Sequence, residues 1–178
     1  MPDQVSNKAT DVSRVWDILE GNSIGMLTTR FEDGLRARPL EARPDRGAGM
    51  IFFVTDVRGY KDDEIAAHPD VCWTVTVEED NVYLSITGRA SVAKDPERAH
   101  RIWKSTDSVW WKEGPDDPNA RVLTIEPVMA ELWDGPSSKL VAAYEFAKAK
   151  VTGGKPLVGE NRKTTVVMGE DVSGGTRA

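Results

Sequence analysis

The organisation of this chain is decided by residues 24–40, which read IGMLTTRFEDGLRARPL. Two β-prone segments, Ile24 to Thr29 and Leu35 to Leu40, flank the turn Phe31-Glu32-Asp33-Gly34. An Asp-Gly pair between two such segments is a strong short-range signal of a β-hairpin, because tight hairpin turns need residues that tolerate positive φ. We therefore expect the first two strands of an antiparallel sheet here.

Further strands are expected downstream of this hairpin. A loop from Ala42 to Gly49 leads into Met50 to Thr55, which is apolar on both faces and therefore predicts a central strand. The remaining expected strands are Val71 to Glu78, Val82 to Thr87 with a bulge at Gly88 before Ala90 to Val92, Arg121 to Ile125, and Val128 to Trp133 after Glu126-Pro127.

Four helices are predicted around these strands. Each has a recognisable start or stop, such as an Asp or Ser cap, a proline in the first turn or a terminal glycine. The expected helices run from Asp11 to Gly21, from Lys61 to Ala67, from Asp95-Pro96-Glu97 to about Ser105, and from Ser137 or Ser138 to Val151. A weak β segment at Thr164 to Met168 lies in the segment that follows.

This pattern predicts a mainly β protein with peripheral helices, of the α+β class. About seven short strands in meander order favour a small antiparallel barrel, because closure hides the edges of the sheet. We expect residues 1–152 to form one domain and residues 153–178 to form a tail that is mobile or packs on a partner subunit.

Composition and charge exclude several classes of function. The 178 residues are 39% hydrophobic and 29% charged, with a net charge of −6, which disfavours binding to nucleic acid. No apolar run approaches the roughly 18 residues that cross a membrane, and the N-terminus lacks signal character, so we expect a cytoplasmic protein. The single cysteine, Cys72, fits a reducing compartment. His68 and His100 have no partners at metal-ligand spacing, so no metal site is expected.

Two stretches could bind a phosphate group. Arg36 and Arg38 point to the same face of the expected second strand, where two guanidiniums could converge on a phosphate, but their spacing alone favours the alternative of a solvated face of an edge strand. Thr55 ends a strand and Lys61 begins a helix, a pairing that suits an anion but is common by chance.

Aromatic residues raise a second set of alternatives. Trp133 at a strand end, followed by Lys139, could cover an aromatic ligand, or could be a core tryptophan before a capped helix. Trp103, Trp110 and Trp111 are expected to pack a helix and loop onto the barrel or a subunit interface, without a chemical role. No phosphate-binding glycine loop and no nucleophile triad is recognisable.

In their order and spacing, these segments resemble the flavin-binding, pyridoxamine 5′-phosphate oxidase-like split-barrel superfamily, and most closely its general stress protein 26 family. The resemblance covers roughly Val12 to Val151. Its specific elements are IGMLTT at 24–29, Arg38-Pro39-Leu40, FFVTD at 52–56 with Lys61, and ELWDGPSSKL at 131–140.

The resemblance implies an antiparallel split β-barrel that dimerises and binds two FMN molecules between its subunits. It assigns Arg36 or Arg38, Thr55 and Lys61 to the FMN phosphate and ribityl chain, and the backbone of Pro39, Leu40 and Val54 to the isoalloxazine. Trp133 resembles the tryptophan that the second subunit contributes, and Tyr83 falls where the oxidase has a flavin-contacting glutamine. Lys139 stands at the first position of the arginine-rich segment of the oxidase.

Departures from the oxidase argue against oxidation of pyridoxamine phosphate. Ala143 replaces a later arginine of that segment, and Glu41-Ala42 stands where the oxidase has a lysine. The resemblance therefore implies a stress-related FMN-dependent oxidoreductase, such as a flavin reductase using NAD(P)H. The alternatives are a non-catalytic flavin-binding or storage protein, and a split barrel that has lost its cofactor.

Overall fold

The structure is a computed structural model that describes residues 8–57, 61–134, 150 and 162–168. Side chains at 8–10, 61, 62, 134 and 162 are outside this description. Its helices and strands are α1 (Lys8–Gly21), β1 (Ile24–Phe31), β2 (Gly34–Glu41), β3 (Arg43–Asp45), β4 (Met50–Asp56), α2 (Lys61–Ala67), β5 (Asp70–Val77), β6 (Val82–Ala93), α3 (Pro96–Ile102), the 3-10 helices η2 (Ser105–Val109) and η3 (Gly114–Asp116), β7 (Ala120–Asp134) and β8 (Arg162–Val167).

A single antiparallel sheet connects all of the strands. Its order is β2-β1-β5-β6-β7-β4-β3, and β8 pairs with β7 beside this path. The two end strands, β2 and β3, are joined in the chain by Ala42 alone. The sheet therefore has to curl until its ends meet, and β2 comes into contact with β4. This confirms the predicted mainly β, antiparallel barrel with peripheral helices.

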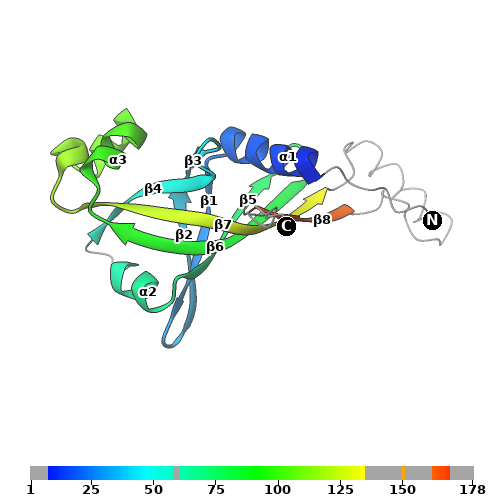
Figure 1. Cartoon of the computed structure of the whole chain (residues 1–178), viewed down its shortest axis with the longest axis horizontal. Coiled ribbons are helices and arrows are strands. Elements are labelled where there is room, and N and C mark those ends of the chain that lie inside the picture. The colour runs from blue at the N-terminus through cyan, green and yellow to red at the C-terminus, as the bar shows by residue number, and fades with distance from the viewer. Residues whose placement is uncertain (1–7, 58–60, 135–149, 151–161, 169–178) are drawn as a thin grey trace, which may run out of the picture.

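The core lies inside this curled sheet. Alternate side chains of β5 and β6 are buried, as expected for strands with one face inward. Val15, Trp16 and Leu19 of α1 pack into the same core, which includes Phe53 and Trp73 with ring centroids 6.2 Å apart. Figure 1 shows α1 along one side of the sheet and α2 on the other. β4 is buried on both faces as predicted, but it is next to the end strand β3 in the sheet order and not at its centre.

The strand pair expected at 121–125 and 128–133 is wrong, because β7 is one continuous strand. Pro127 lies opposite Gly88, where the register of β6 and β7 shifts. Proline has no N–H to give to the ladder, and the bulge at Gly88 accommodates it without ending the strand. The bulge predicted at Gly88 is thereby confirmed.

Other boundaries also differ from the prediction. The expected loop at 42–49 contains β3, which pairs with β4. The third helix begins as predicted, since the Asp95 side chain accepts a hydrogen bond from the Arg98 N–H at 2.9 Å, but it ends at Ile102 rather than Ser105. Trp103 is extended there, and η2 follows as a separate turn.

The two ends of the chain are described only in part. Helix α1 begins at Lys8, so Asp11 lies in its first turn instead of capping it. The weak β segment forms β8, which adds a strand to the sheet of its own chain within the segment expected as a tail. The expected helix from Ser137 or Ser138 lies outside the described residues apart from Lys150.

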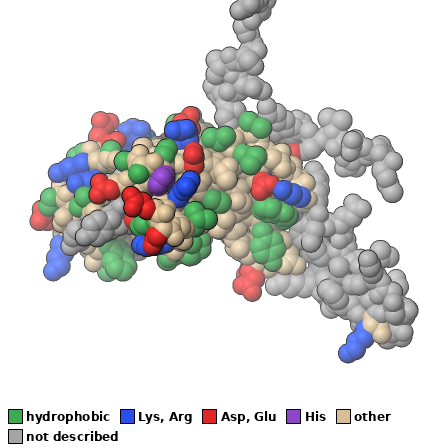
Figure 2. All heavy atoms as spheres, turned by 90° about the horizontal axis from the view of Figure 1, so that it is seen from below, with side chains coloured by type: hydrophobic (Ala, Val, Ile, Leu, Met, Phe, Trp, Pro, Cys, Tyr) green, Lys and Arg blue, Asp and Glu red, His purple; other side chains and the backbone are tan. Residues whose placement is uncertain are grey.

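The described surface carries both signs of charge. Figure 2 shows acidic and basic side chains interspersed on the face seen from below, with hydrophobic side chains between them. Among the helices in the described ranges, none has the length and apolar character that would let it span a bilayer.

Candidate functional site

A cleft of about 340 Å³ opens where β2 meets β4, and we call it the seam cleft. It brings together four residues that the sequence singled out: Pro39, Leu40, Val54 and Thr55. Its other lining residues are Glu41, Arg43, Asp56, Asp107, Trp110 and Trp111. The seam cleft is within the size range of small-molecule sites, and it combines aliphatic walls with polar groups in the manner of such sites.

Strand pairing explains why the seam cleft lies here. β2 is an end strand that pairs with β1 along its whole length, so its other edge faces the seam. β3 pairs only with Met50–Phe52 of β4, and the seam cleft begins beyond that pairing, at Val54. A strand edge presents backbone N–H and C=O groups, which suit a planar ligand with donors and acceptors along its rim.

Arg43 fixes the wall opposite the strands. Its guanidinium is 8% exposed, lies 3.0 Å from Asp107 Oδ1 and donates from Nε to the Ile102 carbonyl at 3.2 Å. It also donates to the Glu41 carbonyl at 2.9 Å. A buried guanidinium is stable only when hydrogen bonds and ion pairs compensate its lost hydration. Because one of these partners is Asp107, Arg43 ties η2 to the corner between β2 and β3.

This anchoring places two tryptophans at the seam cleft. Trp111 is buried against Val54 and Ala120, and its ring meets Trp103 edge-on at 5.9 Å. Trp110 lines the seam cleft while 75% exposed. The packing predicted for Trp103 and Trp111 is observed, but sequence reasoning missed Trp110 as a lining residue. An exposed indole at a cleft can cover an aromatic ring system. The spacing of the tryptophans in the sequence does not reveal that Trp110 has this position.

Trp111 also leaves a donor unused. Its indole Nε1 is buried with no hydrogen-bond partner among the described residues. A buried N–H without an acceptor is costly, and a ligand acceptor that reached it would remove that cost.

Glu41 holds the rim of the seam cleft in an ion-pair network. Its carboxylate lies 2.5 Å from Lys104 Nζ and 3.4 Å from Arg43 Nη2. Burial raises the pKa of Glu41, but the hydrogen bond from Lys104 and the charges of Arg43 and Lys104 outweigh it, so that the pKa is lowered. The position that departs from the oxidase thus carries a carboxylate neutralised by two cations.

Arg38 directly precedes Pro39 of the seam cleft in β2, and its side chain is held by α2. Its Nη2 donates to Thr29 Oγ1 at 3.1 Å and to Glu64 Oε2 at 3.2 Å, with 22% of the side chain exposed. Lys61 is the first residue of α2, one turn before Glu64, but its side chain is outside the description. The structure therefore brings Arg38 and the start of α2 to one neighbourhood.

Arg36 points to the same face of β2 but lies nearer the hairpin turn. Its guanidinium pairs with Asp33 at 3.1 Å and stacks over Phe31 at 3.9 Å. The side chain is 57% exposed, and it does not line the seam cleft.

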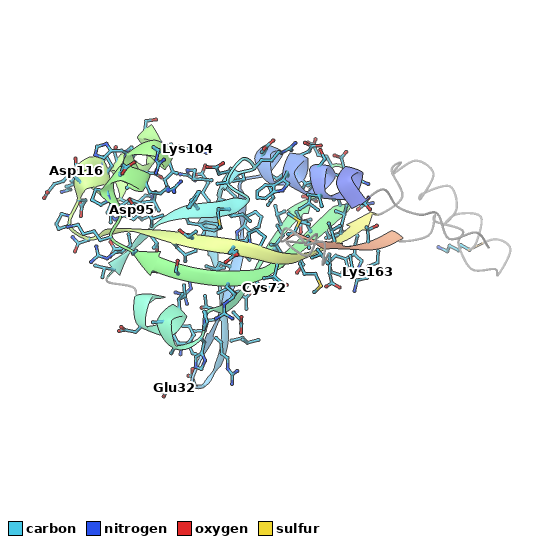
Figure 3. The ribbon with its side chains drawn as sticks, in the orientation of Figure 1. Glu32, Cys72, Asp95, Lys104, Asp116 and Lys163 are labelled. Carbon is cyan, nitrogen blue, oxygen red and sulfur yellow. The ribbon has the colours of Figure 1, made fainter. Side chains whose placement is uncertain are left out.

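Tyr83 and Trp133 form a separate group. They are direct partners across β6 and β7, and Lys163 of β8 lies 5.3 Å from the Trp133 ring. Val54 pairs with Val122, and Trp133 follows about eleven residues later on β7, or roughly 35 Å of extended strand. Figure 3 shows the same separation, because Lys104, the ion-pair partner of Glu41 at the seam cleft, and Lys163 lie well apart along the long axis. Lys139 lies outside the described residues.

An antiparallel barrel that opens along a seam, with the cleft at that opening, defines the split-barrel class of proteins. The chain belongs to the family described as pyridoxamine 5′-phosphate oxidase like, whose model matches residues 10–156. It is 28% identical over 118 residues to general stress protein 26 of Bacillus subtilis, covering 64% of this chain and 81% of the relative.

Solved structures of similar proteins agree with this assignment. A general stress protein 26 structure from Jannaschia sp. CCS1 is 26% identical, has a TM-score of 0.65 and covers 89% of this chain and 98% of its own. The general stress FMN/FAD binding protein of Xanthomonas citri is 26% identical, has a TM-score of 0.62 and covers 70% of this chain and 89% of its own.

Proposed function

We propose that this protein binds FMN between the subunits of a homodimer and acts as a flavin-dependent oxidoreductase of the flavin reductase type. The observation that carries the proposal is the seam cleft, which gathers Pro39, Leu40, Val54 and Thr55 next to Arg38. Related proteins are described as binding FMN or FAD, which supports the same cofactor here.

The residues present suit a flavin mononucleotide. Pro39, Leu40 and Val54 offer an apolar wall for a planar ring, and Trp110 offers an exposed indole at the opening. Arg38 supplies a guanidinium of the kind that binds phosphate through two parallel hydrogen bonds. Trp111 packs against Val54 and so supports this apolar wall.

Two features support a second copy of the chain as the partner. Trp133 on β7 and its partner Tyr83 on β6 lie far along the sheet from the seam cleft of their own chain, so in this proposal they complete the site of another subunit. The outward side chains from β1 to β6 are uncharged over a wide area, as is typical of interface cores: Met26, Thr28, Cys72, Thr74, Thr76, Tyr83, Ser85 and Thr87. Arg30, Asp70 and Arg89 lie at the end of this face.

The protein side chains would bind and orient, while the bound flavin supplies the electron-transfer chemistry. Arg38 would hold the phosphate, and Trp110 together with the partner's Trp133 would exclude water from the ring. NAD(P)H is the proposed electron donor. We also propose a cytoplasmic location, in keeping with the free thiol of Cys72.

The absorbance spectrum of the purified protein tests flavin binding directly, since bound oxidised flavin is yellow. We expect a flavin spectrum, and an FMN titration that saturates at one FMN per chain. A colourless protein that leaves FMN fluorescence unchanged would contradict the proposal. Mixing the FMN-loaded protein with NADH or NADPH tests catalysis: turnover to an acceptor supports the oxidoreductase, and binding without reduction supports a storage role.

A further inference from the structure

A second and larger cleft, of about 590 Å³, lies between the end of α1, β3, β4 and α3, and we call it the α3 cleft. Arg43 lines both clefts, and the Glu41–Lys104 ion pair joins the rim of one to the lining of the other. Pro39, Leu40, Val54, Thr55 and Trp110, which line the seam cleft, do not line the α3 cleft.

The α3 cleft is basic in an acidic protein. Its lining includes five cations, which are Arg43, Arg46, Arg98, Arg101 and Lys104. Only two carboxylates, Glu20 and Asp45, line it as well. The whole chain has a net charge of −6, so this local excess of positive charge is opposite in sign to the average surface.

Three of the five cations already have close carboxylate partners. Arg43 pairs with Asp107, Lys104 pairs with Glu41, and Arg46 pairs with Asp17 and Glu20. These pairs hold the walls of the α3 cleft.

Arg98 and Arg101 differ from the other three. The Arg98 guanidinium lies 4.4 Å from the centre of the Phe52 ring, and no carboxylate in the described part of the chain lies within ion-pair distance of it. Among the described residues, Arg101 pairs only with the exposed Glu97, at 3.7 Å and one turn earlier in α3. Arg98 and Arg101 are three residues apart on α3, so their guanidinium groups are neighbours on the helix surface. Each guanidinium can bind a phosphate through two parallel hydrogen bonds, and this spacing suits two adjacent phosphate groups.

We propose that the α3 cleft binds a small molecule through a phosphate or diphosphate group, held by Arg98 and Arg101. Phe52 is covered by Arg98 and so orients the guanidinium instead of stacking on a base. Recognition is therefore directed at the phosphates, and the site is independent of the flavin.

Isothermal titration with pyrophosphate and with ADP tests this proposal. The FMN-saturated full-length protein is used, so that the seam cleft is filled, and Arg38→Gln protein is titrated in parallel to detect any binding at the flavin phosphate site. The test variant is Arg98→Gln/Arg101→Gln. Its matched control is Lys94→Gln/Lys112→Gln, which removes the same charge from exposed positions outside the α3 cleft.

We expect wild type to bind both ligands with similar affinity, and the arginine double variant to raise the Kd for each by about tenfold or more. Arg98→Lys/Arg101→Lys should lose less affinity, because lysine keeps the positive charge but cannot make the paired hydrogen bonds of a guanidinium. The lysine control and Arg38→Gln should bind like wild type. Unchanged FMN affinity in the arginine double variant verifies its fold and keeps this test separate from the proposed flavin function.

Three results would overturn the proposal. Wild type could fail to bind pyrophosphate, or the arginine and lysine double variants could lose equal affinity, which would indicate a general charge effect. Binding of ADP without pyrophosphate would show that a base, and not phosphate, is recognised.

Discussion

Arg36 and Arg38 illustrate at the residue scale what a sequence pattern can and cannot decide. Their alternation correctly predicts that both point to one face of β2, and both guanidiniums lie over Phe31. Only the tertiary contact with Glu64 of α2 distinguishes them, because it ties Arg38 to α2. The alternative of a solvated strand face fits Arg36, whereas a phosphate-binding role for Arg38 stays a prediction.

Arg38→Gln should weaken FMN binding by about 1.5–3 kcal/mol, the scale of a charge-assisted hydrogen bond, while Arg36→Gln should leave the Kd unchanged. Fluorescence titration measures both. Because Arg38→Gln strands the carboxylate of Glu64, which is 9% exposed, Arg38→Gln/Glu64→Gln controls for stability. An equal loss of FMN affinity in Arg36→Gln and Arg38→Gln would contradict a specific role of Arg38 in the flavin site.

Glu41 predicts a pH dependence of stability. Its pKa is lowered in the folded state, so its ion pairs stabilise the fold above the ordinary glutamate pKa of about 4.3 and cease to do so as pH falls through the lowered value. Glu41→Gln should therefore be less stable than wild type near pH 6, by up to about 1 kcal/mol since the group is partly exposed, and nearly equal near pH 3.

Urea unfolding at the two pH values measures this difference. The control is Glu97→Gln, whose side chain is 86% exposed and which should match wild type at both pH values. A Glu41→Gln deficit that persists or grows on acidification would contradict the ion-pair account.

At the scale of elements, the sequence predicts the strands with clear alternation and misses what depends on distant partners. The hairpin of β1 and β2 was predicted from its local sequence, although its two-residue turn is Glu32-Asp33 and Gly34 pairs with Phe31. The continuity of β7 was not, because Pro127 normally interrupts a strand and only its partner Gly88 on β6 removes the conflict. Likewise, η2 reaches the seam cleft through the Arg43–Asp107 pair, which joins residues far apart in the chain.

Gly88→Ala should destabilise the protein by about 1–3 kcal/mol. A Cβ at this position would lie 2.3 Å from the Glu126 carbonyl oxygen and 2.9 Å from Ile125 Cγ2, so the bulge would have to open. Gly21→Ala is the matched control, because its Cβ meets nothing within 4 Å, and it should change stability by less than about 0.5 kcal/mol. Urea midpoints at constant slope measure both, and equal midpoints would show that the bulge is not tightly packed.

At the scale of the whole molecule, one chain carries two separated parts of one proposed site. The seam cleft is lined by residues of β2, β4 and η2, whereas Trp133 and its partner Tyr83 lie next to β8. The fold could be inferred from the order of motifs, but the division of the site could not be worked out from spacing alone, because it depends on how far β7 extends. A symmetric dimer would bring each seam cleft against the tryptophan of the other copy.

Subunit complementation tests this division most directly. Arg38→Gln damages the seam half and Trp133→Ala damages the other half, so each homodimer should bind FMN weakly. Co-expression in equal amounts and random pairing should produce dimers in which one of two sites is intact, so that about a quarter of the protomers bind FMN with wild-type affinity. If both variants fold and no high-affinity fraction appears, or if Trp133→Ala alone binds like wild type, the site is not shared between subunits.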